Sequence, residues 1–151
     1  MLRWCLLFVI LAPVAGLRAA DVAAAEANLK RVASLVEAGA APRSALKAAE
    51  EQLHDARNEQ VLRETLYSGN VTPQEVPEML RAASELRARA AETLAAQQRL
   101  VSEGVLPARA LERWQQDQAR AEQQWDLAQS RAKLVEELAE MAQREAELQE
   151  R

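Results

Sequence analysis

The chain has 151 residues and a formal net charge of −4, with 19 basic and 23 acidic side chains. This length allows at most one ordinary domain. The acidic balance gives no electrostatic reason to bind DNA, RNA or an anionic membrane surface. We therefore expect no nucleic-acid partner and only indirect contact with a membrane.

The first segment has the features of a secretory signal peptide. Arg3 precedes an apolar run over residues 4–17, which is followed by Arg18 and two alanines. A basic start, a short apolar centre and small residues at the end are typical of such signals. The run is shorter than the roughly 20 residues that span a bilayer as a helix. We expect residues 1–20 to be a signal peptide and the protein to be exported to the periplasm or cell envelope. An uncleaved anchor is the alternative.

Export would remove the single cysteine, Cys5, with the signal. The mature chain would then have no thiol, no disulfide and no cysteine ligand for a metal. Its net charge would fall to −6, because Arg3 and Arg18 leave with the signal. Residues 21–151 would form one helical coiled-coil domain.

Three phrases in the mature chain combine a glycine with a proline. A glycine in the left-handed conformation closes a helix easily, and proline is favoured in the first helical turn. The phrases therefore predict three chain reversals between four helices, at about 21–38, 42–67, 73–103 and 107–151. The pairs are Gly39 with Pro42, Gly69 with Pro73, and Gly104 with Pro107.

The middle turn has a further signal for a helix start. Thr72 and Glu75 have the spacing of a capping box, in which each side chain bonds the backbone N–H of the other residue. Pro77 allows the third helix to begin anywhere from residue 73 to 77. An up-down-up-down order of the helices would place the first and third turns at the same end.

Apolar residues recur at alternating spacings of three and four in each predicted helix, as in a coiled-coil seam. In the first helix the seam consists of Val22, Ala25, Leu29, Val32 and Val36. The last helix carries one stripe of Leu111, Trp114, Ala121, Trp125, Ala128, Ala132 and Val135, and a second stripe of Leu127, Leu134, Leu138, Met141 and Leu148. Two stripes predict contact with two neighbouring helices.

The predicted fold is all-α, with a long C-terminal helix. It consists either of antiparallel up-down coiled-coil hairpins or of an elongated four-helix bundle. Alanine at many seam positions buries little apolar area per residue. A single hairpin of this composition would be only marginally stable, so we expect self-association or a protein partner.

The residues give no sign of catalysis. His54 is the only histidine, which excludes a histidine pair on a metal and a serine–histidine triad with a second base. Glycines do not cluster as they do around bound phosphate. We expect no enzyme, no metal and no cofactor. His54 is interpreted as a solvated or interface residue, with pH sensing as the alternative. Trp114 and Trp125 lie three helical turns apart on one face and are candidate interface residues.

One register of residues resembles known transport proteins. It reads Gly39-x-x-Pro42-x-x-x-Leu46-x-x-Ala49-x-x-x-Leu53-x-x-Ala56, and its second copy keeps Gly104, Pro107 and Leu111. The register resembles the helix starts of TolC-like outer membrane efflux proteins and the helical hairpins of HlyD-like periplasmic adaptors. No run of alternating β-branched residues predicts the strands that complete those proteins. The resemblance is therefore to their helical coiled-coil region.

The resemblance implies a role for the turns. In such families the hairpin tips dock the adaptor onto the channel. The corresponding candidates here are Arg31, Leu35, Gly39, Pro42, Leu100, Gly104 and Pro107. Pro42 and Pro107 stand where adaptor tips often carry serine or threonine.

Two hypotheses follow for the function. In the first, the protein is an exported, non-catalytic coiled-coil interaction module of the cell envelope that docks to an efflux or secretion assembly through its helix tips. In the alternative, it is a self-assembling structural rod or the stalk of a larger envelope protein. The expected partner is accordingly a protein of the envelope or a second copy of the chain.

Overall fold

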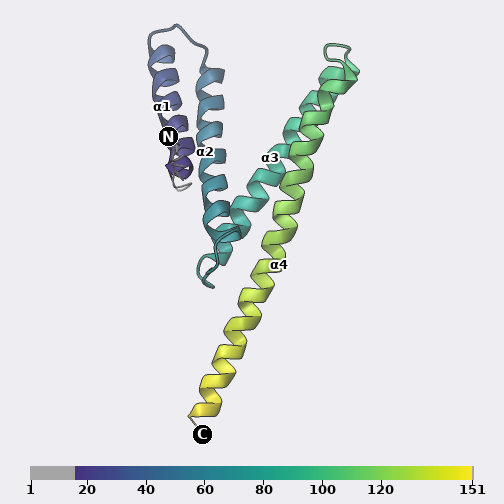
Figure 1. Cartoon of the computed structure of the whole chain (residues 1–151). Helices are drawn as coiled ribbons and strands as arrows, with labels where there is room; N and C mark the ends of the chain where they lie inside the picture. Colours follow the sequence, from purple (N-terminus) through teal and green to yellow (C-terminus); the bar gives the residue numbers. More distant parts are fainter. Residues whose placement is uncertain (1–15, 151) are drawn as a thin grey trace, which may run out of the picture. The chain divides into compact units, whose positions relative to one another are not determined.

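The computed structural model describes residues 16–150, which form four α-helices and no strand. The helices are α1 (Gly16–Glu37), α2 (Arg43–Leu66), α3 (Val76–Ser102) and α4 (Leu111–Gln149), with a short 3-10 helix, η1 (Ala108–Ala110), before α4 (Figure 1). The all-α prediction with a long C-terminal helix is thus confirmed. No helix within residues 16–150 has the length and apolar character needed to cross a membrane.

The signal-peptide prediction falls largely outside the described residues. The structure starts α1 at Gly16, five residues before the expected start of the mature helix. The other predicted helices begin and end within four residues of the observed bounds. Cleavage after residue 20 stays a prediction.

The chain divides into two compact units, with the boundary between Leu53 and His54. In the first unit, α1 and the first part of α2 run side by side as an antiparallel hairpin (Figure 1). The predicted seam residues of α1 are all partly buried, and Ala49 and Leu53 of α2 are buried. Asn28 Nδ2 donates a hydrogen bond of 3.1 Å to Gln52 Oε1. The seam predicted from the spacing therefore joins these two helices.

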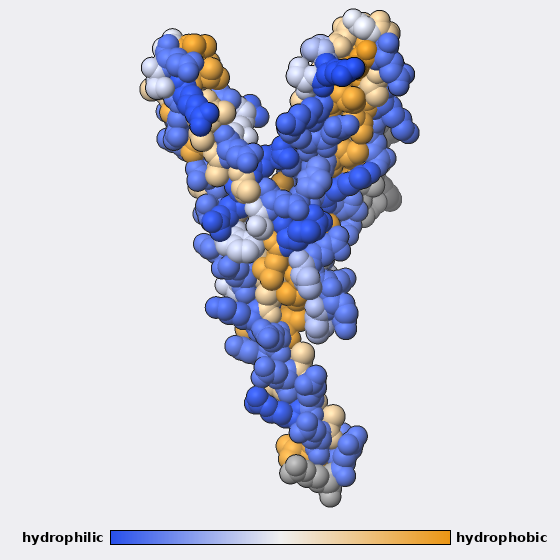
Figure 2. All heavy atoms as spheres, turned by 180° about the vertical axis from the view of Figure 1, so that it is seen from behind, coloured by the Kyte–Doolittle hydropathy of each residue, from blue (hydrophilic) through white to orange (hydrophobic). Residues whose placement is uncertain are grey.

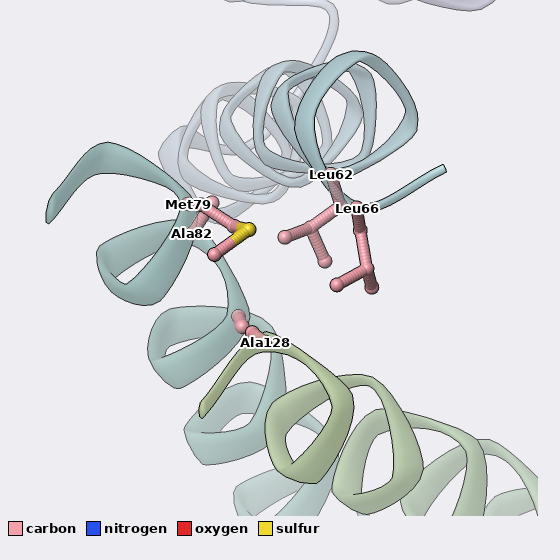
Figure 3. Close-up of a cluster of buried hydrophobic side chains, with 6 residues drawn as sticks. Leu62, Leu66, Met79, Ala82 and Ala128 are labelled. Carbon is pink, nitrogen blue, oxygen red and sulfur yellow. The ribbon is translucent and has the colours of Figure 1, made fainter. Parts of the chain in front are cut away.

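The second unit has a core where the end of α2 meets α3 and α4. Its buried residues are Leu62, Leu66, Met79, Ala82, Ala83 and Ala128. The Met79 side chain points toward the two leucines, and Ala128 approaches from α4 (Figure 3). Alanine has no side chain beyond Cβ, so the helix backbones come close enough for one methionine and two leucines to fill the space between them. Trp125 and Leu86 pack around this cluster.

A polar cluster also joins α2 to α3. The buried Asn58 donates a hydrogen bond of 2.9 Å from Nδ2 to Glu85 Oε2. The same oxygen lies 2.8 Å from Arg81 Nη1 and 3.4 Å from His54 Nε2. Burial raises the pKa of Glu85, but the bonds from Asn58 and Arg81 outweigh it and hold this pKa below its usual value. His54 thus lies beside α3, half exposed, as an interface residue.

The end of α2 differs from the prediction. Among the described residues only Gly39 and Gly104 have a positive φ, so the expectation of a left-handed Gly69 was wrong. Instead, Arg131 of α4 donates from Nη1 to the Leu66 carbonyl at 3.2 Å and from Nη2 to the Ser68 carbonyl. The guanidinium satisfies carbonyls that helix ends leave without intrahelical partners. A donor from another helix therefore takes the place of a glycine turn.

The start of α3 shows half of the predicted capping box. The Thr72 N–H and hydroxyl each donate to Glu75 Oε2 at 2.8 Å. The Glu75 N–H donates to the Thr72 carbonyl at 3.0 Å and not to the hydroxyl, so the reciprocal bond is missing. The two bonds from Thr72 hold the pKa of Glu75 below its usual value. The helix then begins at Val76, within the predicted range.

The second stripe of α4 does not find the predicted second neighbour among the described residues. Leu134 is 59% exposed, Leu138 63%, Met141 59% and Leu148 70%. Figure 1 shows that α4 continues well beyond the start of α3, and in Figure 2 this lower end of the molecule carries apolar side chains among polar ones. The stripe is therefore open to solvent in the single chain.

Removal of the Met79 side chain should destabilise the second unit. Met79→Ala leaves a cavity in a fully buried site, and we expect it to lower the free energy of unfolding by about 2–5 kcal/mol. Val105→Ala is the matched control, because this apolar side chain is 65% exposed, and it should cost less than about 1 kcal/mol. Urea unfolding followed by tryptophan fluorescence measures both. Equal losses of unfolding free energy in the two variants would show that the buried cluster does not stabilise this unit.

Loss of the Arg131 guanidinium should loosen the end of α2. Arg131→Met keeps the aliphatic stem but leaves two carbonyls without their charged donor, and we expect a loss of about 1.5–3 kcal/mol in unfolding free energy. Lys133→Met removes an exposed positive charge from the same turn of α4 and should change stability by less than about 0.5 kcal/mol. The same urea titration compares them, and similar losses would contradict the capping role.

Candidate functional site

The described residues offer no arrangement for metal chemistry. No group of three or more histidine, cysteine or carboxylate side chains within residues 16–150 lies close enough to hold a metal ion. The most distinctive local structures are the two turns that begin at Leu35 and Leu100. These turns contain most of the residues singled out from the sequence.

The first turn is a Schellman motif, in which two nested hydrogen bonds close the end of a helix. Gly39 has φ 70° and donates from its N–H to the Val36 carbonyl at 3.0 Å. The Ala40 N–H donates to the Leu35 carbonyl at 2.7 Å. Pro42 then opens the next helix, and its carbonyl accepts from the Ala45 N–H at 2.9 Å.

The third turn repeats this structure 65 residues later. Gly104 has φ 74° and donates to the Val101 carbonyl at 3.0 Å, while the Val105 N–H donates to the Leu100 carbonyl at 2.9 Å. The carbonyl of Pro107 accepts from the Ala110 N–H at 2.9 Å, as that of Pro42 does in the first turn. The repeated sequence motif therefore forms the same backbone structure at both turns.

We name residues 35–42 the Gly39 tip and residues 100–107 the Gly104 tip. The glycines and prolines of both tips are exposed. Leu35 is 38% exposed, whereas Leu100 is partly buried and Val105 beside it is 65% exposed. The Gly39 tip thus presents mainly small side chains, and the Gly104 tip presents a larger apolar one. The tips belong to different units, and their adjacency stays a prediction.

The middle of each tip is uncharged. Residues 38–42 read AGAAP and residues 104–108 read GVLPA, in a chain in which 28% of residues are charged. A glutamate precedes and an arginine follows each stretch: Glu37 and Arg43 in the first, Glu103 and Arg109 in the second. The centre of each tip is therefore a small neutral surface with one acidic and one basic neighbour, a pattern that the sequence did not bring out beforehand.

Arg31 lies on the flank of α1 and not at the tip itself. Its Nη2 donates a hydrogen bond of 2.8 Å to Asn28 Oδ1, one turn further from Gly39. Its carbonyl accepts a bond of 2.8 Å from the Ser34 hydroxyl. The exposed guanidinium is thus held toward the N-terminal part of α1.

Trp125 has a packing role within the second unit. Its half-buried ring packs against the core cluster, and the Arg87 guanidinium lies 5.5 Å from the ring centroid. Arg87 Nε also lies 3.3 Å from Glu122 Oε2, which joins α3 to α4. This pair of contacts explains the position of Trp125 without a ligand.

Trp114 lies in a different environment. It lines an open groove of about 300 Å³ among α2, α3 and α4, together with charged side chains that include Asp55, Arg89, Asp117 and Arg120. Arg89 Nε and Asp55 Oδ1 are 2.8 Å apart. No pattern in the sequence predicts this groove, because its residues come from three helices and share no local spacing.

Comparisons of the chain with protein-family models, with curated proteins and with solved structures give no match. The resemblance to the helical regions of TolC-like and HlyD-like proteins therefore depends on the register of residues alone. The geometry of the two tips is the structural basis for a functional proposal.

The two tip glycines should tolerate substitution less well than the glycine of the middle turn. A Cβ added at any of the three would meet no atom within 4 Å, so only the backbone conformation distinguishes them. We expect Gly39→Ala and Gly104→Ala each to cost about 1–2 kcal/mol, because alanine is strained at positive φ. Gly69→Ala should be nearly neutral. Thermal unfolding by circular dichroism measures all three, and a large loss for Gly69→Ala would contradict the observed turn geometry.

Proposed function

We propose that the protein is an exported, non-catalytic coiled-coil interaction module of the cell envelope that docks end-on to a transport or secretion assembly through the Gly39 and Gly104 tips. The observation that carries the proposal is the same Schellman turn, built from the same phrase, at two places in one chain. A chain reversal does not require this sequence motif. The middle turn reverses the chain with the Arg131 hydrogen bond to the end of α2 and the hydrogen bonds between Thr72 and Glu75.

The surface chemistry of the tips supports docking. Each neutral stretch is mostly exposed and is fixed by backbone hydrogen bonds, so little conformational entropy is lost when a partner covers it. The flanking glutamate and arginine provide charges of both signs at the rim, which favour one orientation of a partner. Such a tip fits a shallow apolar depression at the end of a protein partner.

The resemblance to TolC-like and HlyD-like helical regions supports the class of partner. In those families helix tips dock adaptor to channel, and the register quoted above places Gly39 and Gly104 at the corresponding turns. The signal-like segment of residues 1–20 supports the location in the periplasm or cell envelope.

Photo-crosslinking from the tips tests this proposal. A photoreactive residue at Val105 or Ala40, both exposed, should give crosslinks to a membrane transporter or channel in intact cell envelopes, identified by mass spectrometry. A probe at the exposed Gln74 of the middle turn is the matched control and should not give them. Crosslinks only to other copies of the chain, or the same partners from Gln74, would overturn the docking proposal.

The alternative, a self-assembling rod or stalk, is favoured by one observation, the exposed apolar stripe on α4. In that case the tips would serve only to reverse the chain. Crosslinks from Val105 to an envelope transporter would be unexpected for such a rod, so the same experiment separates the two functions.

A further inference from the structure

The C-terminal part of α4 has the periodicity of a coiled-coil seam but no helix against it among the described residues. Leu127, Leu134, Met141 and Leu148 are seven residues apart, and Leu138 lies between Leu134 and Met141 at a spacing of four and three. The four residues spaced by seven occupy position d of the heptad, and Leu138 occupies position a. From Leu134 onward these side chains are 59–70% exposed.

This surface carries four large apolar side chains that are exposed in the single chain. Leu138, Met141, Ala142 and Leu148 line a shallow groove on α4 together with Arg144 and Glu145. Monomeric proteins seldom leave a contiguous apolar strip exposed, and heptad spacing is the pattern by which one helix packs against another. The occupant that fits the strip is therefore another amphipathic helix.

We propose that α4 of a second copy of this chain covers the strip in antiparallel orientation. In the proposed register, Leu138 lies opposite Met141 of the partner subunit, and the symmetry of the pair forms this contact twice. The twofold axis then passes between Ala139 and Glu140. This self-association uses α4 and not the tips, so it is independent of the docking proposal.

Charges beside the strip support this register. Glu137 and Arg144 occupy successive g positions, and antiparallel helices place g positions on the same side of the seam. Glu137 then faces Arg144 of the partner subunit, again twice. Val135 and Ala142, at the e positions, face one another across the opposite side. Opposite charges at these flanking positions determine which helices pair and in which orientation.

The same positions disfavour a parallel pair. Glu145 occupies position a, so a parallel pair would place it against Glu145 of the partner subunit, and like charges would meet in the seam. Parallel pairing would also place Glu137 next to Ala142 of the partner subunit, so no ion pair would join the two chains there, and Arg144 would keep only the Glu140 of its own chain, whose Oε2 lies 3.1 Å from Arg144 Nη2. In the antiparallel register Glu145 meets Leu134 of the partner subunit, so no like charge faces it across the seam.

Sedimentation velocity tests whether the strip associates. The wild-type chain should form a dimer, and Leu138→Glu should weaken its dissociation constant by about tenfold or more, because a charge enters the apolar seam. Gln143→Glu adds the same charge to the opposite face of α4 and should leave the dimer intact. Circular dichroism checks that both variants stay helical. A monomeric wild-type chain, or equal effects of the two variants, would overturn the proposal.

A charge exchange tests the orientation. Glu137→Arg and Arg144→Glu should each weaken the dimer about three- to tenfold, because each places like charges opposite one another. An equimolar mixture of the two variants should recover wild-type affinity, because every pair across the mixed dimer is again opposite in sign. A mixture that associates no better than either variant alone would overturn the antiparallel register.

Distances between spin labels give a second measurement of orientation. Single labels are placed on a Cys5→Ser chain at Glu140, near the proposed axis, or at Gln149. In the antiparallel dimer the two Gln149 labels should be separated by about 28 Å along the helix axis, and the two Glu140 labels by almost nothing. Equal separations at both positions would indicate a parallel pair. Tip crosslinks to an envelope protein would be unaffected by this outcome, so the two proposals fail separately.

Discussion

Close approach of helices through alanine is the constraint on which the second unit depends. Met79 fills the space between α2, α3 and α4 only because Ala82, Ala83 and Ala128 keep the neighbouring backbones near. Larger side chains at these positions would force the helices apart and leave Met79 loosely packed. The close packing also brings Arg131 of α4 within reach of the carbonyls at the end of α2. One small cluster therefore positions three helices and caps one of them.

Alanine seams have a consequence for the rest of the molecule. They allow close contact but bury little apolar area per residue, so the single chain leaves large apolar groups outside its cores. Apart from Tyr67, directly after α2, those groups among the described residues lie in two places with different chemistry. The centres of the tips are small, neutral and fixed by backbone hydrogen bonds, whereas the strip on α4 is rich in leucine and follows a heptad. A tip suits a shallow depression on a partner, and the strip suits another helix.

The three chain reversals are made in two physical ways. The first and third use a left-handed glycine and nested hydrogen bonds among residues at most six positions apart. The middle one uses a guanidinium from α4, more than 60 residues away, and a glutamate that accepts two bonds from Thr72. The outer turns can thus form as soon as their helices do, while the end of α2 is completed only when α4 has packed.

The sequence by itself determined the helices, the seams and the two outer turns, because these depend on periodicity and on backbone preferences of residues close together in the chain. The same local logic failed at Gly69, where Arg131 supplies the donors that a glycine turn would have provided. It also failed for the second stripe of α4, since spacing shows that a face is apolar but not whether a neighbour covers it. Only the tertiary structure placed Trp125 on the core, Trp114 in a charged groove and Glu85 at the centre of a polar cluster. Such contacts join side chains from different helices, and no spacing within one helix encodes them.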